Sequence, residues 1–84
     1  MNDLIETIDL MKSDDYKKRF VAEYWQTKIR YDKLYNMVGK YESGTLEFTP
    51  SCNIAVFKKQ LHYMKKYLNI LERRAKIEGV TLYF

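Results

Sequence analysis

Apolar residues in the first half of the chain recur at alternating steps of four and three. This heptad spacing is typical of a helix that packs along one side. Only Gly39 interrupts the stretch, so the pattern predicts one long helix over residues 14–43, with Ser13, Asp14 or Asp15 as its cap. The apolar line comprises Phe20, Tyr24, Thr27, Tyr31, Leu34, Val38 and Tyr41.

A second apolar line predicts another long helix over residues 53–78. Its members are Ile54, Phe57, Leu61, Met64, Leu68, Leu71 and Ala75. Gly44 and Gly79 are expected to end the two helices in the left-handed conformation, and residues 79–84 are expected to form a tail. Because the connector over residues 44–52 is short, the two helices are predicted to form an antiparallel hairpin.

The N-terminal residues 2–11 have the pattern of a short amphipathic helix. Leu4, Ile5, Ile8 and Met11 are its apolar positions, with acidic residues between them. Such a short helix needs a surface on which to dock. The sequence therefore predicts an all-α fold in one domain over residues 1–84.

The helix expected over residues 53–78 has a further group of apolar residues, displaced from the first line by about 60–100° around the axis. We call this group the apolar strip: Val56, Tyr63, Tyr67, Ile70 and Ile77. Either a second copy of the chain covers it, or the short N-terminal helix does. The first alternative predicts a homo-oligomer with Tyr63, Tyr67, Ile70 and Ile77 at the interface.

Composition adds a reason to expect an outward-facing contact. The 84 residues include eight tyrosines, four phenylalanines and one tryptophan, more aromatic area than a small core can hide. The apolar content is too high for a disordered chain, and no uncharged run approaches the roughly 18 residues of a membrane span. With one cysteine and no visible signal peptide, a cytosolic location is the default expectation.

Charge is unevenly distributed along the chain. Residues 1–15 hold five acidic residues and one lysine, a net charge of −4, whereas the remainder carries +8. The acidic segment could simply complement a basic surface, or that surface could bind an anionic partner. One candidate surface, which we call the basic edge, has cations spaced by seven, and it is either a solvated face or a track for phosphates: Lys59, Lys66 and Arg73.

Aromatic and cationic residues interleave near the start of the first long helix. Tyr16 or Trp25 could stack on a base while Arg19 and Lys28 pair with phosphates. In the connector, Thr49 and Ser51 precede free backbone N–H groups at a helix start, where an anion could bind or a plain helix cap could suffice. The predicted ligand-binding residues are Tyr16, Arg19, Trp25, Lys28, Thr49 and Ser51.

Catalytic chemistry finds no support in the sequence. One histidine, His62, and one cysteine, Cys52, form no metal-ligand spacing, and no glycine-rich phosphate loop is present. We expect His62 to lie at the edge of the second apolar line and Cys52 to be packed as a small side chain. No cofactor or metal is predicted, and a binding protein is favoured over an enzyme.

Several runs resemble small helical proteins of phages and prophages of Gram-positive bacteria. They are Met11–Phe20, Glu23–Gln26, Thr49–Cys52, Tyr67–Leu68 and Leu71–Ala75. In size and hairpin layout the chain is more weakly similar to phage anti-CBASS and anti-Thoeris sponges, helical oligomers that sequester cyclic nucleotide signals of bacterial immunity. The resemblance implies a phage counter-defence protein acting in the host cytoplasm.

Two functional hypotheses follow. In the first, an oligomeric hairpin sequesters a small anionic molecule of nucleotide type without turnover, in pockets between subunits. In the second, the hairpin is a protein- or nucleic-acid-binding module that inhibits a bacterial defence enzyme, with the basic edge steering the contact. The sign of the charge argues against a DNA mimic, because a mimic needs a negative surface and residues 16–84 are strongly positive.

Overall fold

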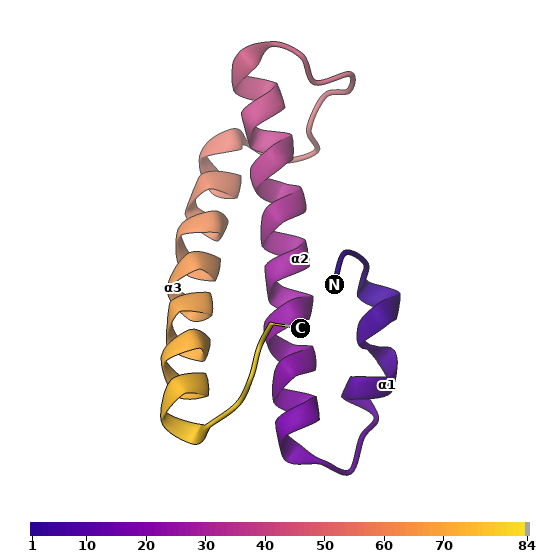
Figure 1. Ribbon diagram of the computed structural model, residues 1–84. Helices are drawn as coiled ribbons and strands as arrows, with labels where there is room; N and C mark the ends of the chain where they lie inside the picture. The colour runs from indigo at the N-terminus through magenta and orange to yellow at the C-terminus, as the bar shows by residue number, and fades with distance from the viewer. Residues whose placement is uncertain (84) are drawn as a thin grey trace.

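The computed structural model describes residues 1–83 as two long antiparallel helices with a short helical segment beside one of them (Figure 1). Helix α2 spans Tyr16–Ser43 and helix α3 spans Ile54–Glu78. The molecule measures 43 × 24 × 19 Å along its principal axes. The prediction of an all-α fold with a short N-terminal helix and a long hairpin is confirmed.

Local signals define the ends of both long helices. The Asp15 side chain accepts a hydrogen bond from the Lys17 N–H at 2.9 Å, so α2 begins at Tyr16. Asn53 caps α3 in the same way, accepting from the Ala55 N–H at 2.8 Å. Gly44 (φ 76°) and Gly79 (φ 70°) follow the last turns in the left-handed conformation, as expected.

The N-terminal segment is not one continuous α-helix over residues 2–11. It starts as the 3₁₀ helix η1 (Leu4–Thr7) and continues as the single-turn α1 (Ile8–Met11). The buried Thr7 hydroxyl donates to the Leu4 carbonyl at 2.6 Å and accepts from Gln26 of α2 at 3.0 Å. The second bond anchors the tight first turn to the long helix.

The segment η1–α1 lies on the side of α2 that faces away from α3 (Figure 1). It packs against α2 and makes no contact with α3. The alternative in which this short helix covers the apolar strip is therefore wrong. All five residues of the strip are exposed within the protomer, with 40–74% of each residue accessible.

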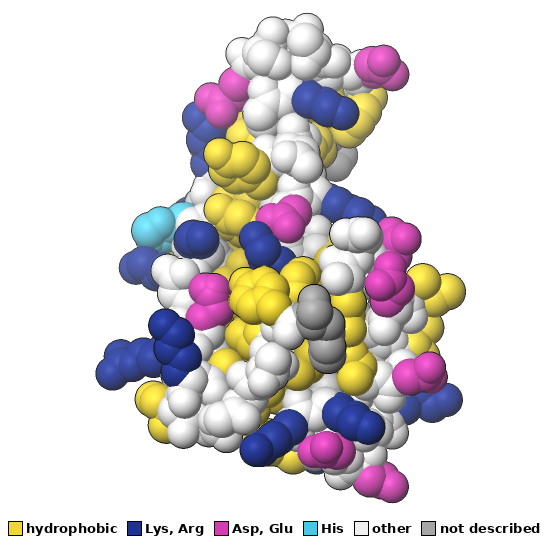
Figure 2. Space-filling view, in the orientation of Figure 1, with side chains coloured by type: hydrophobic (Ala, Val, Ile, Leu, Met, Phe, Trp, Pro, Cys, Tyr) yellow, Lys and Arg dark blue, Asp and Glu magenta, His cyan; other side chains and the backbone are white. Residues whose placement is uncertain are grey.

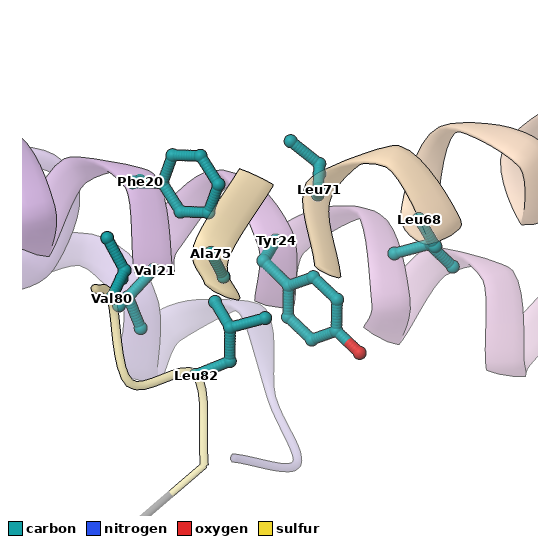
Figure 3. Packing of buried hydrophobic residues seen from close by; sticks show 8 residues of the cluster. All are labelled: Phe20, Val21, Tyr24, Leu68, Leu71, Ala75, Val80 and Leu82. Carbon is teal, nitrogen blue, oxygen red and sulfur yellow. The ribbon is translucent and has the colours of Figure 1, made fainter. Parts of the chain in front are cut away.

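The hydrophobic core joins the first half of α2, the second half of α3 and the C-terminal segment, whose side chains converge in Figure 3. Helix α2 supplies Phe20, Val21 and Tyr24, and α3 supplies three further side chains: Leu68, Leu71 and Ala75. The segment expected only as a tail returns along the hairpin and buries Val80 and Leu82 in this core. Phe84, the last residue of that expected tail, lies outside the described residues.

One residue of the apolar line predicted for the first long helix is exposed, whereas the others are buried or half-buried. Tyr41 is 47% exposed, although the heptad spacing places it between the helices. It lies near the end of α2, where it lines an open hollow together with the connector residues Thr49 and Pro50 and with Ile54, the first residue of α3. Over residues 1–83, no helix is long and apolar enough to cross a membrane.

Candidate functional site

An open groove lies between α2 and α3, in the half of the hairpin nearest the connector. Its volume is about 430 Å³. Because an aromatic pair and several basic side chains line it, the groove offers both a stacking surface and positive charge. The lining residues are Tyr31, Tyr35, Val38, Gly39, Glu42, Lys58, Leu61, His62 and Lys65.

The aromatic pair follows from spacing on one helix. Tyr31 and Tyr35 are four residues apart on α2, and their rings stack at 5.9 Å between centroids with 26° between planes. Tyr31 is half-buried against the core, whereas Tyr35 is 59% exposed. The pair therefore presents a supported aromatic surface to the groove.

Cations surround the inner ring of this pair. The Lys28 ammonium lies 5.8 Å from the centroid of Tyr31, and the Lys65 ammonium lies 5.9 Å from it. A lysine at this distance is attracted to the ring face, and its remaining donors stay available to an anion. The arrangement can hold a planar ring and a negative group side by side.

Acidic residues pair with Lys58, one of the two lysines that line the groove, and with Lys28, which lies beside the aromatic pair. Lys28 pairs with Asp32 at 3.1 Å, and Lys58 pairs with Glu42 at 2.7 Å. Lys65 forms no ion pair within residues 1–83. It is thus the groove cation whose charge remains uncompensated in the protomer.

In the half of the hairpin away from the connector, the C-terminal segment that follows Gly79 fills the space between α2 and α3. The Trp25 indole N–H donates to the Leu82 carbonyl at 2.6 Å, and the Tyr24 and Tyr83 hydroxyls lie 2.7 Å apart. The Trp25 ring also meets the Tyr24 and Tyr83 rings edge to face, both at 5.5 Å. The segment therefore closes one end of the space between the helices and leaves the groove open.

The buried Tyr24 hydroxyl is expected to make the stability of the protein depend on pH at high pH. Burial, the hydrogen bond with Tyr83 and the nearby Glu72 raise the pKa of Tyr24 above its ordinary value of 10.0. Its contribution to stability is present below pH 10 and is lost as the pH rises, because the unfolded chain loses that proton first.

We expect the Tyr24→Phe protein to show a shallower fall of the unfolding free energy with pH. The slope above pH 10 should decrease by about 1 kcal/mol per pH unit, close to one proton. Urea unfolding between pH 9 and pH 11 measures this slope, with Tyr35→Phe as the exposed control. Equal slopes in the two variants would contradict the assignment.

Tyr16 and Arg19, predicted as ligand contacts, are held at the base of the hairpin. Tyr16 donates to the Glu78 carboxylate and accepts from Arg74 at 2.7 Å, while Arg19 donates to the Ser13 carbonyl at 2.8 Å. The hydrogen bond to Glu78 raises the pKa of Tyr16. The pKa of Glu78 is lowered mainly by the hydrogen bond from Tyr16 and also by the one from Arg74. This network ties the start of α2 to the end of α3.

The structure does not bring the six predicted ligand residues together within one protomer. Thr49 and Ser51 are exposed in the connector, and Tyr16 lies at the other end of α2, about 40 Å away along a 28-residue helix. Trp25 faces the C-terminal segment. Lys28 alone borders the groove's aromatic pair.

The basic edge and the apolar strip lie on the outer side of α3. Lys59, Lys66 and Arg73 are exposed, and none of them forms an ion pair in the part of the chain that the structure describes. Within the strip, the Tyr67 hydroxyl donates to Glu23 of α2. The other four strip residues have free apolar surface.

Two further expectations concern single residues. Cys52 is exposed in the connector and is not packed as predicted, because it borders an open hollow between the last turns of α2 and the start of α3. His62 is exposed at the edge of the second apolar line, where it borders the groove beside Lys65. Among residues 1–83, no group of three or more His, Cys, Asp or Glu side chains is placed to hold a metal ion.

Sequence reasoning missed most of the groove. The predicted ligand-binding residues did not include Tyr35, Lys58, His62 or Lys65, and Tyr31 was assigned only to the apolar line. The sequence does contain a pattern that points to these residues. Tyr31 and Tyr35 are four residues apart, and Lys58, His62 and Lys65 follow at steps of four and three, so each group lies on one side of its helix.

A protein-family model matches most of the chain. The model of a family described as Sequestin matches residues 14–77. This range contains all of α2 and all of α3 except its last residue, so every groove residue lies within it. Neither a curated protein nor a solved structure matches the chain.

Proposed function

The chain belongs to the Sequestin family, and we propose that it is a phage counter-defence protein that sequesters a small anionic molecule of nucleotide type. The family name indicates sequestering, in agreement with a binding role. Binding without turnover needs a site of suitable shape and charge and no catalytic group. The phage setting rests on the sequence resemblance to phage proteins, and the host cytoplasm would be the place of action.

The observation that carries this proposal is the stacked tyrosine pair flanked by lysines in the open groove. A base would stack on the exposed face of Tyr35, and the ammonium of Lys65 would pair with a phosphate. Lys28 and Lys58 lie nearby and are each paired with one carboxylate, so Lys65 would supply the uncompensated positive charge. Such a site selects planar, negatively charged molecules.

A calorimetric screen of cyclic di- and trinucleotides and ADP-ribose derivatives tests the proposal. We expect at least one of them to bind, and Lys65→Ala to weaken that binding by about tenfold or more, because a charge-assisted contact is lost. Lys33→Ala, an exposed cation elsewhere on α2, is the matched control and should bind as the unmodified protein does. Recovery of the ligand unchanged by mass spectrometry would support sequestering over turnover.

The same screen separates the groove from the six residues predicted from sequence. If Arg19→Ala and Ser51→Ala weaken binding and Lys65→Ala does not, the ligand does not bind in the groove. It then binds where the start of α2 in one protomer meets the connector of another protomer. If no compound in the screen binds, the nucleotide proposal fails.

We also propose that the protein is a homo-oligomer. All five residues of the apolar strip are exposed in the protomer, and a contiguous exposed apolar patch often marks an interaction surface. Sedimentation velocity at increasing protein concentration measures the assembly. A constant monomer mass over that range would rule it out.

A second candidate function is favoured by the unpaired basic edge: a module that binds a defence protein or nucleic acid. Contacts with several phosphates of a nucleic acid weaken steeply with salt, whereas a small ligand in the groove responds less. Absence of DNA retention in gel shifts at about 50 mM salt would eliminate the nucleic-acid form of this candidate.

A further inference from the structure

The two outer sides of the protomer carry opposite charge. Helices α1, α2 and α3 lie side by side in one layer, with α2 in the middle (Figure 1). In the space-filling view, acidic side chains gather over the α1 side and basic side chains over the α3 side (Figure 2). Helix α3 has seven basic and two acidic residues, whereas residues 1–15 have one basic and five acidic residues.

Neither charged side is neutralised inside the protomer. Asp3, Glu6 and Asp9 are exposed, and within residues 1–83 none of them reaches a lysine or arginine. The basic edge is unpaired in the same way. An acidic segment folded back over the basic surface of its own chain is therefore not what the structure contains.

Each charged side also carries exposed apolar residues in register with its charges. On α3, Val56, Tyr63, Ile70 and Ile77 recur every seven residues, and the cations of the basic edge recur at the same interval between them. On the N-terminal segment, Ile5 is 74% and Ile8 41% exposed, next to Glu6 and Asp9. Both sides thus present an apolar line bordered by charges, and the charges have opposite sign.

From this complementarity we infer that the acidic N-terminal segment of one protomer docks on the apolar strip and basic edge of a second copy. Pairing of two α3 helices would leave the lysines and arginines of both copies together without carboxylates between them, which costs free energy. Docking of η1–α1 on α3 places Glu6 and Asp9 beside Lys66 and Arg73 while covering Ile70.

This contact joins two different faces, and those faces lie on opposite sides of the layer. Such head-to-tail association forms a ring if the rotation between neighbours closes and an open chain if it does not. The eight residues of η1 and α1 span about 12–14 Å, whereas the strip extends about 32 Å along α3. Each contact is therefore small, and we expect association to increase with protein concentration and to weaken with salt.

Charge reversal on either side tests the inference, which rests on the proposed assembly and not on the groove. We expect Lys66→Glu with Arg73→Glu to weaken self-association at least about tenfold, and Glu6→Lys with Asp9→Lys to do the same. All four changes in one chain should restore association, because the attraction is reversed on both sides. Circular dichroism checks that each variant retains the helix content of the parent.

Cross-linking identifies the faces directly. In a Cys52→Ser background, proteins carrying Ile8→Cys and Ile70→Cys are mixed and oxidised. We expect the main product to be a disulfide between positions 8 and 70, whereas a main product joining two copies at position 70 would overturn the inference. Exposed Lys33→Cys mixed with Ile70→Cys is the matched control and should give little product.

Other outcomes would also contradict docking of the N-terminal segment on α3 of a second copy. Association that survives both charge reversals would mean that another surface joins the protomers. If the unmodified protein does not self-associate and Lys66→Glu with Arg73→Glu abolishes binding to anionic vesicles or DNA, the basic edge serves one of those partners. The ligand screen with Lys65→Ala remains informative in every case, since Lys65 lies in the groove and not on the outer side of α3.

Discussion

Replacing Leu71 with alanine is expected to lower the free energy of unfolding by about 3 kcal/mol. Leu71 is 1% exposed and belongs to the cluster formed by both long helices and the C-terminal segment. The change removes buried apolar surface and leaves a cavity that rigid helices fill only in part. For a domain of this size the total is of the order of 4–12 kcal/mol, so the variant should be close to unfolding.

The neighbouring Ile70 provides the matched control for this prediction. It is 57% exposed, so Ile70→Ala should change the unfolding free energy by less than about 0.5 kcal/mol. Urea denaturation followed by circular dichroism, at a concentration where the protein is monomeric, measures both variants. Similar losses for Leu71→Ala and Ile70→Ala would mean that α3 is rotated about its axis relative to the structure described above.

Replacing Val80 and Leu82 together with alanine is expected to cost about 4 kcal/mol. Both side chains are buried, Leu82 to 6% exposure, and they cover one end of the space between α2 and α3. Their loss would also loosen the backbone that accepts the hydrogen bond from Trp25. The indole should then become more exposed to water.

Two measurements check this second prediction. Urea unfolding gives the loss of stability, and quenching of Trp25 fluorescence by acrylamide reports exposure of its indole in the folded state. The control is Thr81→Ala, because Thr81 is exposed between the two buried residues. If the double variant matches the control in both measurements, the C-terminal segment does not belong to the core.

Much of the fold could be predicted because its determinants are local. Asp15 and Asn53 cap helices through hydrogen bonds to residues two positions away, and Gly44 and Gly79 adopt a conformation that glycine favours. The apolar lines predict which sides of α2 and α3 meet. The burial of Val80 and Leu82 was not foreseen, because it depends on the direction in which the chain returns after Gly79.

The candidate site was harder to predict because it depends on two helices at once. Spacing identifies Tyr31 as an apolar-line residue, but only packing determines that its ring borders an open groove with Lys65. Trp25 stands next to cations in the sequence, yet its indole bonds to the carbonyl of Leu82, 57 residues later. No local pattern contains that information.

The exposed connector has a practical consequence for measuring these properties. Cys52 is the single cysteine of the chain, and it is exposed in the connector, away from the residues of the hydrophobic core. A maleimide dye can therefore be attached to the native sequence at one defined position without disturbing the core. Energy transfer between donor- and acceptor-labelled protein would follow subunit exchange over time, and the unlabelled Trp25 would report on the core of the same molecules.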